Sequence, residues 1–129
     1  MTTLLVTVGM GANVDPQNTL YTPLERSMRQ AQAGTIWLLP SSESRRHAEH
    51  LQSALPDLPI QVAPMLPPDS EEDPDKCFHF FEAWIRQLIE SGVHPSGIVL
   101  DYTRGTKTMS AAALMAALSN GVDRFAYVS

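Results

Sequence analysis

The sequence predicts an α/β fold of the Rossmann-like, three-layer kind. Short apolar runs rich in β-branched residues alternate with helical patterns, and the elements follow the order βαβαβαβαβ. Strands separated by helices of this length are joined by right-handed crossovers, which give a parallel sheet with helices on both faces. We therefore expect a mainly parallel sheet of five or more strands in the spatial order 3-2-1-4-5, with ligands bound at the carboxyl ends of its first and fourth strands.

The predicted strands are apolar runs bounded mostly by glycine, proline or polar residues. The run at residues 59–64 has a proline at each end, which suits an edge strand because proline donates no ladder hydrogen bond. The five predicted strands span residues 3–8, 35–40, 59–64, 97–103 and 124–128.

The predicted helices rest on apolar residues at helical spacing and on capping residues at their ends. The second helix is expected to start from a cap at Ser41 or Ser42, and its His47 and His50 are interpreted as solvated. The acidic run at residues 69–75 is interpreted as a solvated loop. The four helices are expected at about residues 20–34, 41–55, 75–91 and 106–120.

The composition predicts one globular domain that spans residues 1–129. The net charge of −5 gives no overall attraction for duplex nucleic acid, and the single cysteine, Cys77, is interpreted as a small buried hydrophobe. No segment has the pattern of a signal peptide or an apolar run of roughly 20 residues, so we expect a cytoplasmic protein without membrane insertion. His47 and His50 lack nearby acidic or cysteine partners, so no metal site is expected, and no cofactor is expected either.

The loop after the first strand contains Gly9, Met10, Gly11 and Asn13. Glycines let a backbone turn sharply and approach a ligand closely, although a plain tight turn would use them equally well. Val14 stands where a dinucleotide fingerprint has its third glycine, which weakens a nicotinamide or flavin interpretation.

The segment that follows the fourth strand, residues 101–110 (DYTRGTKTMS), is the most informative stretch of the chain. It gathers two cations, several hydroxyls and a glycine at a junction between a strand and a helix. The amino end of a helix favours an anion, Lys107 adds a charge, and Thr106 or Thr108 adds donors, so we expect phosphate binding. Thr106 precedes Lys107 where a Walker A loop requires glycine, which disfavours ATP hydrolysis. The alternative is that Thr106 only caps the helix and Lys107 is solvated.

At these residues the sequence resembles the CRISPR-associated Rossmann-fold (CARF) domain. The stretch DYTRGTKTMSAA and the VTVG of the first strand are similar to the two family motifs, and the likeness runs along essentially the whole chain. Arg104 replaces a glycine of the family pattern, and Met10 replaces a serine or threonine. The matching positions are Asp101, Thr103, Gly105, Thr106, Lys107, Met109 and Ser110.

The resemblance implies a homodimer that senses cyclic tetra- or hexa-adenylate, the second messengers of type III CRISPR defence. Such a sensor domain usually controls a fused effector domain, and the chain carries none, so excision from a longer effector is expected. The implied ligand-binding residues come from both loops, with weaker candidates after the second strand. They are Gly9, Met10, Gly11, Asn13, Ser41, Ser42, Thr103, Arg104, Gly105, Thr106, Lys107, Thr108 and Met109.

Two alternatives stay open at this point. Some CARF proteins cleave the ring without metal, and here Lys107 would stabilise the charge that develops on the phosphate while Thr106 or Ser110 orients a hydroxyl. Slow or absent cleavage is placed ahead of efficient cleavage because Met10 lacks a hydroxyl. The other alternative is a Rossmann-like domain for a different nucleotide.

Overall fold

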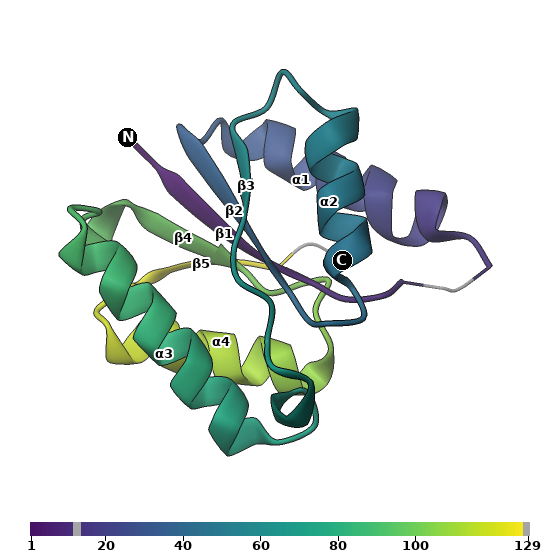
Figure 1. Ribbon diagram of the computed structural model, residues 1–129. Helices are drawn as coiled ribbons and strands as arrows, with labels where there is room; N and C mark the ends of the chain where they lie inside the picture. Colours follow the sequence, from purple (N-terminus) through teal and green to yellow (C-terminus); the bar gives the residue numbers. More distant parts are fainter. Residues whose placement is uncertain (12–13, 128–129) are drawn as a thin grey trace.

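The structure is a computed structural model that describes residues 1–11 and 14–127, and it is built on a five-stranded parallel sheet (Figure 1). The strands lie in the order β3-β2-β1-β4-β5, and every pair of neighbours is parallel. The predicted fold class and strand order are confirmed. The strands are β1 (Thr3–Val8), β2 (Thr35–Pro40), β3 (Ile60–Val62), β4 (Ile98–Asp101) and β5 (Arg124–Ala126).

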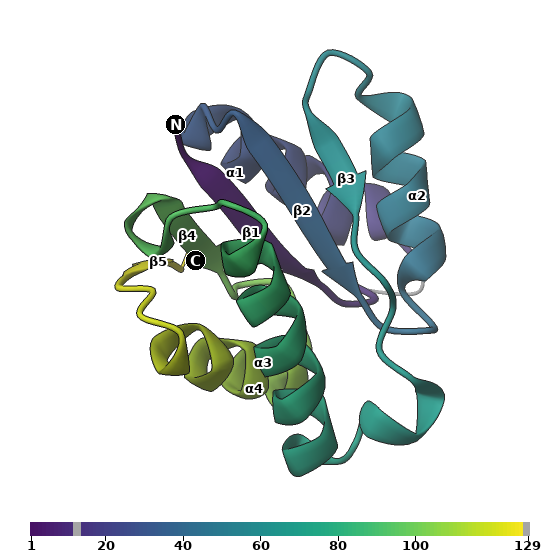
Figure 2. The ribbon, with the colours of Figure 1, turned by 60° about the vertical axis from the view of Figure 1, so that its left-hand side comes forward.

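Helices cover both faces of the sheet, which makes the three layers (Figures 1 and 2). Successive side chains of β1 point to opposite faces, so Leu4 packs in the cluster with Leu24 and Leu51, whereas Leu5 packs in the cluster with Phe81. All six residues of β1 are buried, as a strand covered on both faces requires. One layer contains α1 (Thr22–Ala31) and α2 (Arg45–Ala54), and the other contains α3 (Pro74–Glu90) and α4 (Lys107–Ser119).

Several element boundaries in the structure differ from those predicted. β3, β4 and β5 are shorter than predicted, and residue 128 lies outside the described residues. A turn of π-helix, η1 (Gln17–Tyr21), precedes α1. α2 begins only at Arg45, and neither Ser41 nor Ser42 caps it. Instead the Ser41 and Ser44 hydroxyls accept hydrogen bonds from each other's backbone N–H, at 3.2 and 2.9 Å.

The acidic run before α3 is not the free loop that the sequence predicts. It includes a short 3-10 helix, η2 (Pro68–Ser70), and its side chains have specific partners. The Glu71 carboxylate accepts hydrogen bonds from the Ser42 backbone N–H at 2.6 Å and from the Ser42 hydroxyl. The Asp73 carboxylate caps α3 by accepting hydrogen bonds from the Asp75 and Lys76 backbone N–H groups. The run therefore ties the segment after β3 to the loop after β2.

His47 is buried, with 5% of its surface exposed, so its interpretation as a solvated residue is wrong. The Tyr21 hydroxyl lies 2.5 Å from its Nδ1, and the Tyr21 ring stacks on exposed His50 with 4.5 Å between ring centres. Burial lowers the pKa of His47, and the charges of Arg46 and His50 lower this pKa further. Cys77 is buried as predicted, and burial raises the pKa of its thiol to about 11.

No helix among the residues that the structure describes is both long enough and apolar enough to cross a bilayer.

The lowered pKa of His47 predicts how the stability depends on pH. Below about pH 6.5 the unfolded chain binds a proton at His47 that the folded chain resists, so the free energy of unfolding falls as the pH falls. His47→Gln should weaken this dependence, measured by urea unfolding at about pH 7.5 and about pH 5.5. His50→Gln, at an exposed neighbouring position, is the control. Equal pH dependence in wild type and His47→Gln would contradict the expectation.

Candidate functional site

The loops that follow β1 and β4 lie side by side because these strands are neighbours in the sheet. The Gly9 backbone N–H donates a hydrogen bond to the Arg104 carbonyl oxygen at 2.9 Å. A Cβ at Gly9 would lie 2.5 Å from that same oxygen, closer than any side chain tolerates. The glycine after β1 therefore permits the two loops to meet.

Gly105 brings the second loop down onto β1. A Cβ there would lie 2.7 Å from Thr7 Oγ1 and 2.8 Å from Thr7 Cβ, and it would press on the Ser110 hydroxyl at 3.1 Å. The backbone between β4 and α4 consequently packs against β1 with no room for a side chain at this position.

The second loop is held in shape by its own residues. The Asp101 carboxylate accepts a hydrogen bond from the Thr103 N–H at 3.0 Å, and the Ser110 hydroxyl donates to the Tyr102 carbonyl oxygen at 2.8 Å. Thr106 is the N-cap of α4, because its hydroxyl oxygen accepts from the Met109 N–H at 3.1 Å. These bonds place Lys107 at the first position of α4.

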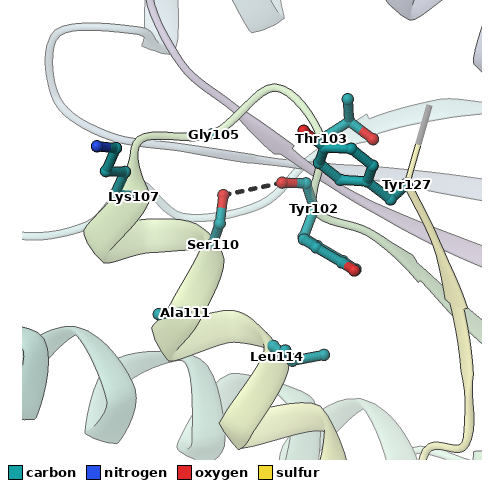
Figure 3. Close-up of a pocket in the computed structure, with 8 residues that line it drawn as sticks. All are labelled: Tyr102, Thr103, Gly105, Lys107, Ser110, Ala111, Leu114 and Tyr127. Carbon is teal, nitrogen blue, oxygen red and sulfur yellow. Dashed lines mark hydrogen bonds between the residues drawn. The ribbon is translucent and has the colours of Figure 1, made fainter. Parts of the chain in front are cut away.

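A pocket of about 330 Å³ opens beside this loop (Figure 3). Lys107 lies at one end, with its ammonium directed away from the rings in this view, and Tyr102 and Tyr127 lie together at the other, with 5.5 Å between their ring centres. Tyr127 is 66% exposed. The pocket thus joins a cationic end to an aromatic end. Its lining residues are Tyr102, Thr103, Gly105, Lys107, Ser110, Ala111, Leu114 and Tyr127.

The cationic end of the pocket is not neutralised within the described part of the chain. There, neither Lys107 nor Arg104 forms an ion pair, and the first turn of α4 contains no acidic residue. The unpaired N–H groups of that turn carry the partial positive charge of the helix dipole. The arrangement favours an anion such as a phosphate at this point.

The predicted site residues divide between the pocket and its surroundings. Thr103, Gly105, Lys107 and Ser110 line the pocket, whereas Gly9 and Arg104 join the two loops. Gly11, with φ 65°, and Met10 belong to the loop after β1, and Thr108 is half-buried in the first turn of α4. Asn13 lies outside the described residues.

Three predicted ligand contacts lie away from the pocket. Met109 is fully buried in the core, and Ser41 is buried and bonded to Ser44, whose hydroxyl donates to the Val8 carbonyl at 2.6 Å. Ser42 is bonded to Glu71. Among the described residues no group of histidine, cysteine and acidic side chains is arranged to hold a metal ion.

Sequence reasoning missed the aromatic end of the pocket. Tyr127 follows β5, which lies next to β4, so its backbone leaves the sheet at the same edge as the predicted loops. The order of strands was therefore the signal that could have identified Tyr127. Ala111 and Leu114 lie one and two turns after Lys107 on the same side of α4, and helical periodicity could have added them.

Comparison with protein-family models and with curated proteins gives no match. Among solved structures, the chain is similar to Can2 from Sulfobacillus thermosulfidooxidans in complex with cyclic tetra-adenylate, with a TM-score of 0.66 at 18% sequence identity. The two chains share a fold. The likeness covers 100% of this chain and 32% of the Can2 chain, so the chain spans about a third of the length of Can2.

The cap of α4 allows a test of what Thr106 does in the protein without ligand. Thr106→Ala removes the acceptor for the Met109 N–H, so the free energy of unfolding should fall by about 1 kcal/mol. Thr106→Ser keeps the oxygen, so its free energy of unfolding should fall by much less. Urea denaturation measures both values. Equal stability of Thr106→Ala and wild type would mean that the cap contributes nothing to folding.

Proposed function

We propose that this chain is a CARF domain that binds cyclic tetra- or hexa-adenylate with the loops after β1 and β4. The observation that carries the proposal is the pocket of Figure 3, where Lys107 at a helix start and two tyrosine rings line one hollow. The fold shared with Can2, whose structure contains cyclic tetra-adenylate, supports the same ligand class. The resemblance of residues 101–110 to the family motif supports it independently of the fold.

The phosphates of the ring would lie against the start of α4. The N–H groups of its first turn and the Lys107 ammonium supply donors and positive charge. Arg104 adds a second cation to the same loop, and its carbonyl oxygen is bonded to the Gly9 N–H. This local concentration of positive charge explains how a chain of net charge −5 can hold a polyanion.

An adenine base would occupy the aromatic end of the pocket. The Tyr102 and Tyr127 rings offer stacking surfaces, and stacking of one base on an aromatic side chain contributes about 1–3 kcal/mol. The pocket of about 330 Å³ also reaches the lower limit of ordinary ligand sites, about 300 Å³. Phosphate and base are thus recognised at opposite ends of one hollow.

The sensor would work as a homodimer that buries the outer face of α4. The inner face of this helix is in the core, yet Met115 and Leu118 on the outside are 61% and 55% exposed. A helix that is apolar on all sides is normally buried. A second copy related by a twofold axis would cover this outer face and bring two Lys107 pockets around one ring. A cytoplasmic sensor of type III CRISPR messengers is the role that follows.

Cleavage of the ring by the same site is the main alternative. The ribose 2′-oxygen would attack the adjacent phosphorus while the bond to the 5′-oxygen breaks, giving a 2′,3′-cyclic phosphate and a 5′-hydroxyl. However, the Thr106 and Ser110 hydroxyls that would assist this step hold the loop instead. We therefore favour binding without cleavage. Chromatography of the ring after hours with the protein decides, because linear products would establish the enzyme.

A domain for another nucleotide is the remaining alternative. If a mononucleotide or dinucleotide raised the melting temperature more than either cyclic ring, the fold would be shared with Can2 without the ligand.

Ligand binding should raise the melting temperature through Lys107. At a ligand concentration of about 100 times Kd, the gain of about 2.7 kcal/mol corresponds to about 10 °C for a domain of this size. Lys107→Ala should lose most of the shift with the ring that binds best. The control Arg26→Ala removes an exposed cation of α1 and should keep the full shift in melting temperature. No shift with either ring, or an equal shift in Lys107→Ala, would contradict the proposal.

The dimer surface has a matched pair of variants. Met115→Lys places a charge on the outer face of α4 and should give a monomer, whereas Met65→Lys changes another exposed apolar residue, outside α4 and outside the two ligand loops, and should leave the dimer intact. Size-exclusion chromatography with light scattering measures the mass. A wild-type monomer, or a dimer that survives Met115→Lys, would contradict the predicted interface.

A further inference from the structure

We propose that the hollow between α1 and the β4–β5 edge of the sheet is a second base site that takes adenine. The hollow has a volume of about 240 Å³. It lies on the face of the sheet that α1 and α2 cover, whereas Ala111 and Leu114 of the Lys107 pocket belong to α4 on the opposite face (Figure 1). The two sites are therefore distinct, although both adjoin the end of β4.

The floor and walls of the hollow have different chemistry. Leu4 and Val99 form an apolar floor, and Ser27 and Gln30 of α1 form a polar wall. Arg124 and Asp101 also line it. The register pairs Val99 with Arg124 and Asp101 with Ala126, so the two charged residues are diagonal neighbours on one face, about 8 Å apart between Cα atoms. A flat polar ligand can bridge them over an apolar surface.

Asp101 is the reason to expect a ligand here. Its residue surface is only 2% exposed, and its Oδ1 accepts the Thr103 N–H at 3.0 Å. Within the described part of the chain, no donor is paired with its Oδ2. Every fully enclosed polar side-chain atom there has a hydrogen-bond partner, so Oδ2 keeps some accessible surface. Because Asp101 lines the hollow, we infer that this surface faces it. A buried carboxylate oxygen without a donor is costly, and a ligand donor would remove that cost.

The pattern of donors and acceptors fits adenine and distinguishes it from hypoxanthine. Oδ2 of Asp101 can accept one hydrogen bond, and the Gln30 amide and Arg124 guanidinium can donate to an acceptor beside it. Adenine presents one amino donor next to ring nitrogen acceptors, on a flat apolar body. Hypoxanthine has a carbonyl oxygen in place of the amino group, which would face the carboxylate oxygen. The volume is below the range of about 300–1,000 Å³ for whole ligands, which suits a base rather than a complete nucleotide.

The adenine could come from a free mononucleotide or from a ring bound at the nearby loop, and amide NMR distinguishes them. Titration with adenosine monophosphate should shift the Ser27, Ala31 and Val99 amides, with binding about tenfold weaker or more for inosine monophosphate. If cyclic tetra-adenylate shifts the same amides and competes with adenosine monophosphate, the ring reaches the hollow. If only the mononucleotide shifts them, the hollow takes free nucleotide.

Asp101→Asn gives the sharpest variant, because its amide oxygen can still accept the Thr103 N–H while its NH₂ faces the hollow. The preference should then reverse toward inosine monophosphate. Asp123→Asn, at an exposed acid, is the control and should bind like wild type. The comparison of the two mononucleotides on wild-type protein needs no variant, so it stands even if Asp101→Asn fails to fold.

Two results would overturn the inference. One is that adenosine monophosphate shifts no amides around the hollow, or shifts only those of Lys107 and Tyr127. The other is equal affinity for the two mononucleotides. Lys107→Ala separates this site from the proposed function, because it should leave the amide shifts that adenosine monophosphate causes at the hollow unchanged. Shifts at the hollow without ring binding at Lys107 would refute the proposed function and leave the second site in place.

Discussion

The hydrogen bond from the Gly9 N–H to the Arg104 carbonyl holds together the two loops on which the site depends. It forms only because β1 and β4 are parallel neighbours and because neither Gly9 nor Gly105 has a side chain to block the approach. Once the loops meet, the bonds of Asp101, Thr106 and Ser110 fix the start of α4 and so place Lys107. The site is consequently preorganised before any ligand arrives, which lowers the entropy cost of binding.

The sheet could be predicted from the sequence because each strand carries its own signal. The buried run of β1 and the helical periodicities are local, the crossover rule then gives a parallel sheet, and the usual order of doubly wound folds is the one observed. The loop after β4 was equally local, since its hydroxyls and cations are contiguous in the chain. The predictions that failed concerned residues whose surroundings depend on distant parts of the chain. Glu71 is half-buried because its carboxylate bonds to Ser42, and His47 is buried beside Tyr21 of η1.

The candidate site shows the same division between local and distant contributions. Lys107 and Thr106 were visible in one motif, whereas the aromatic end needs Tyr127, which enters only through the pairing of β5 with β4. Asp101 shows how one motif residue can take part in two surroundings. It lies at the end of β4, its Oδ1 accepts the Thr103 N–H, and it also lines the hollow beside α1. Its position links the two faces of the sheet.

A crystal structure with cyclic tetra-adenylate would show whether a cyclic oligoadenylate lies across the loops after β1 and β4. We expect ring phosphates within hydrogen-bonding distance of the first-turn N–H groups of α4 and the Lys107 ammonium, with an adenine against Tyr127. A ring bound elsewhere on the surface, with the start of α4 facing only water, would refute this binding mode even though the fold would stand.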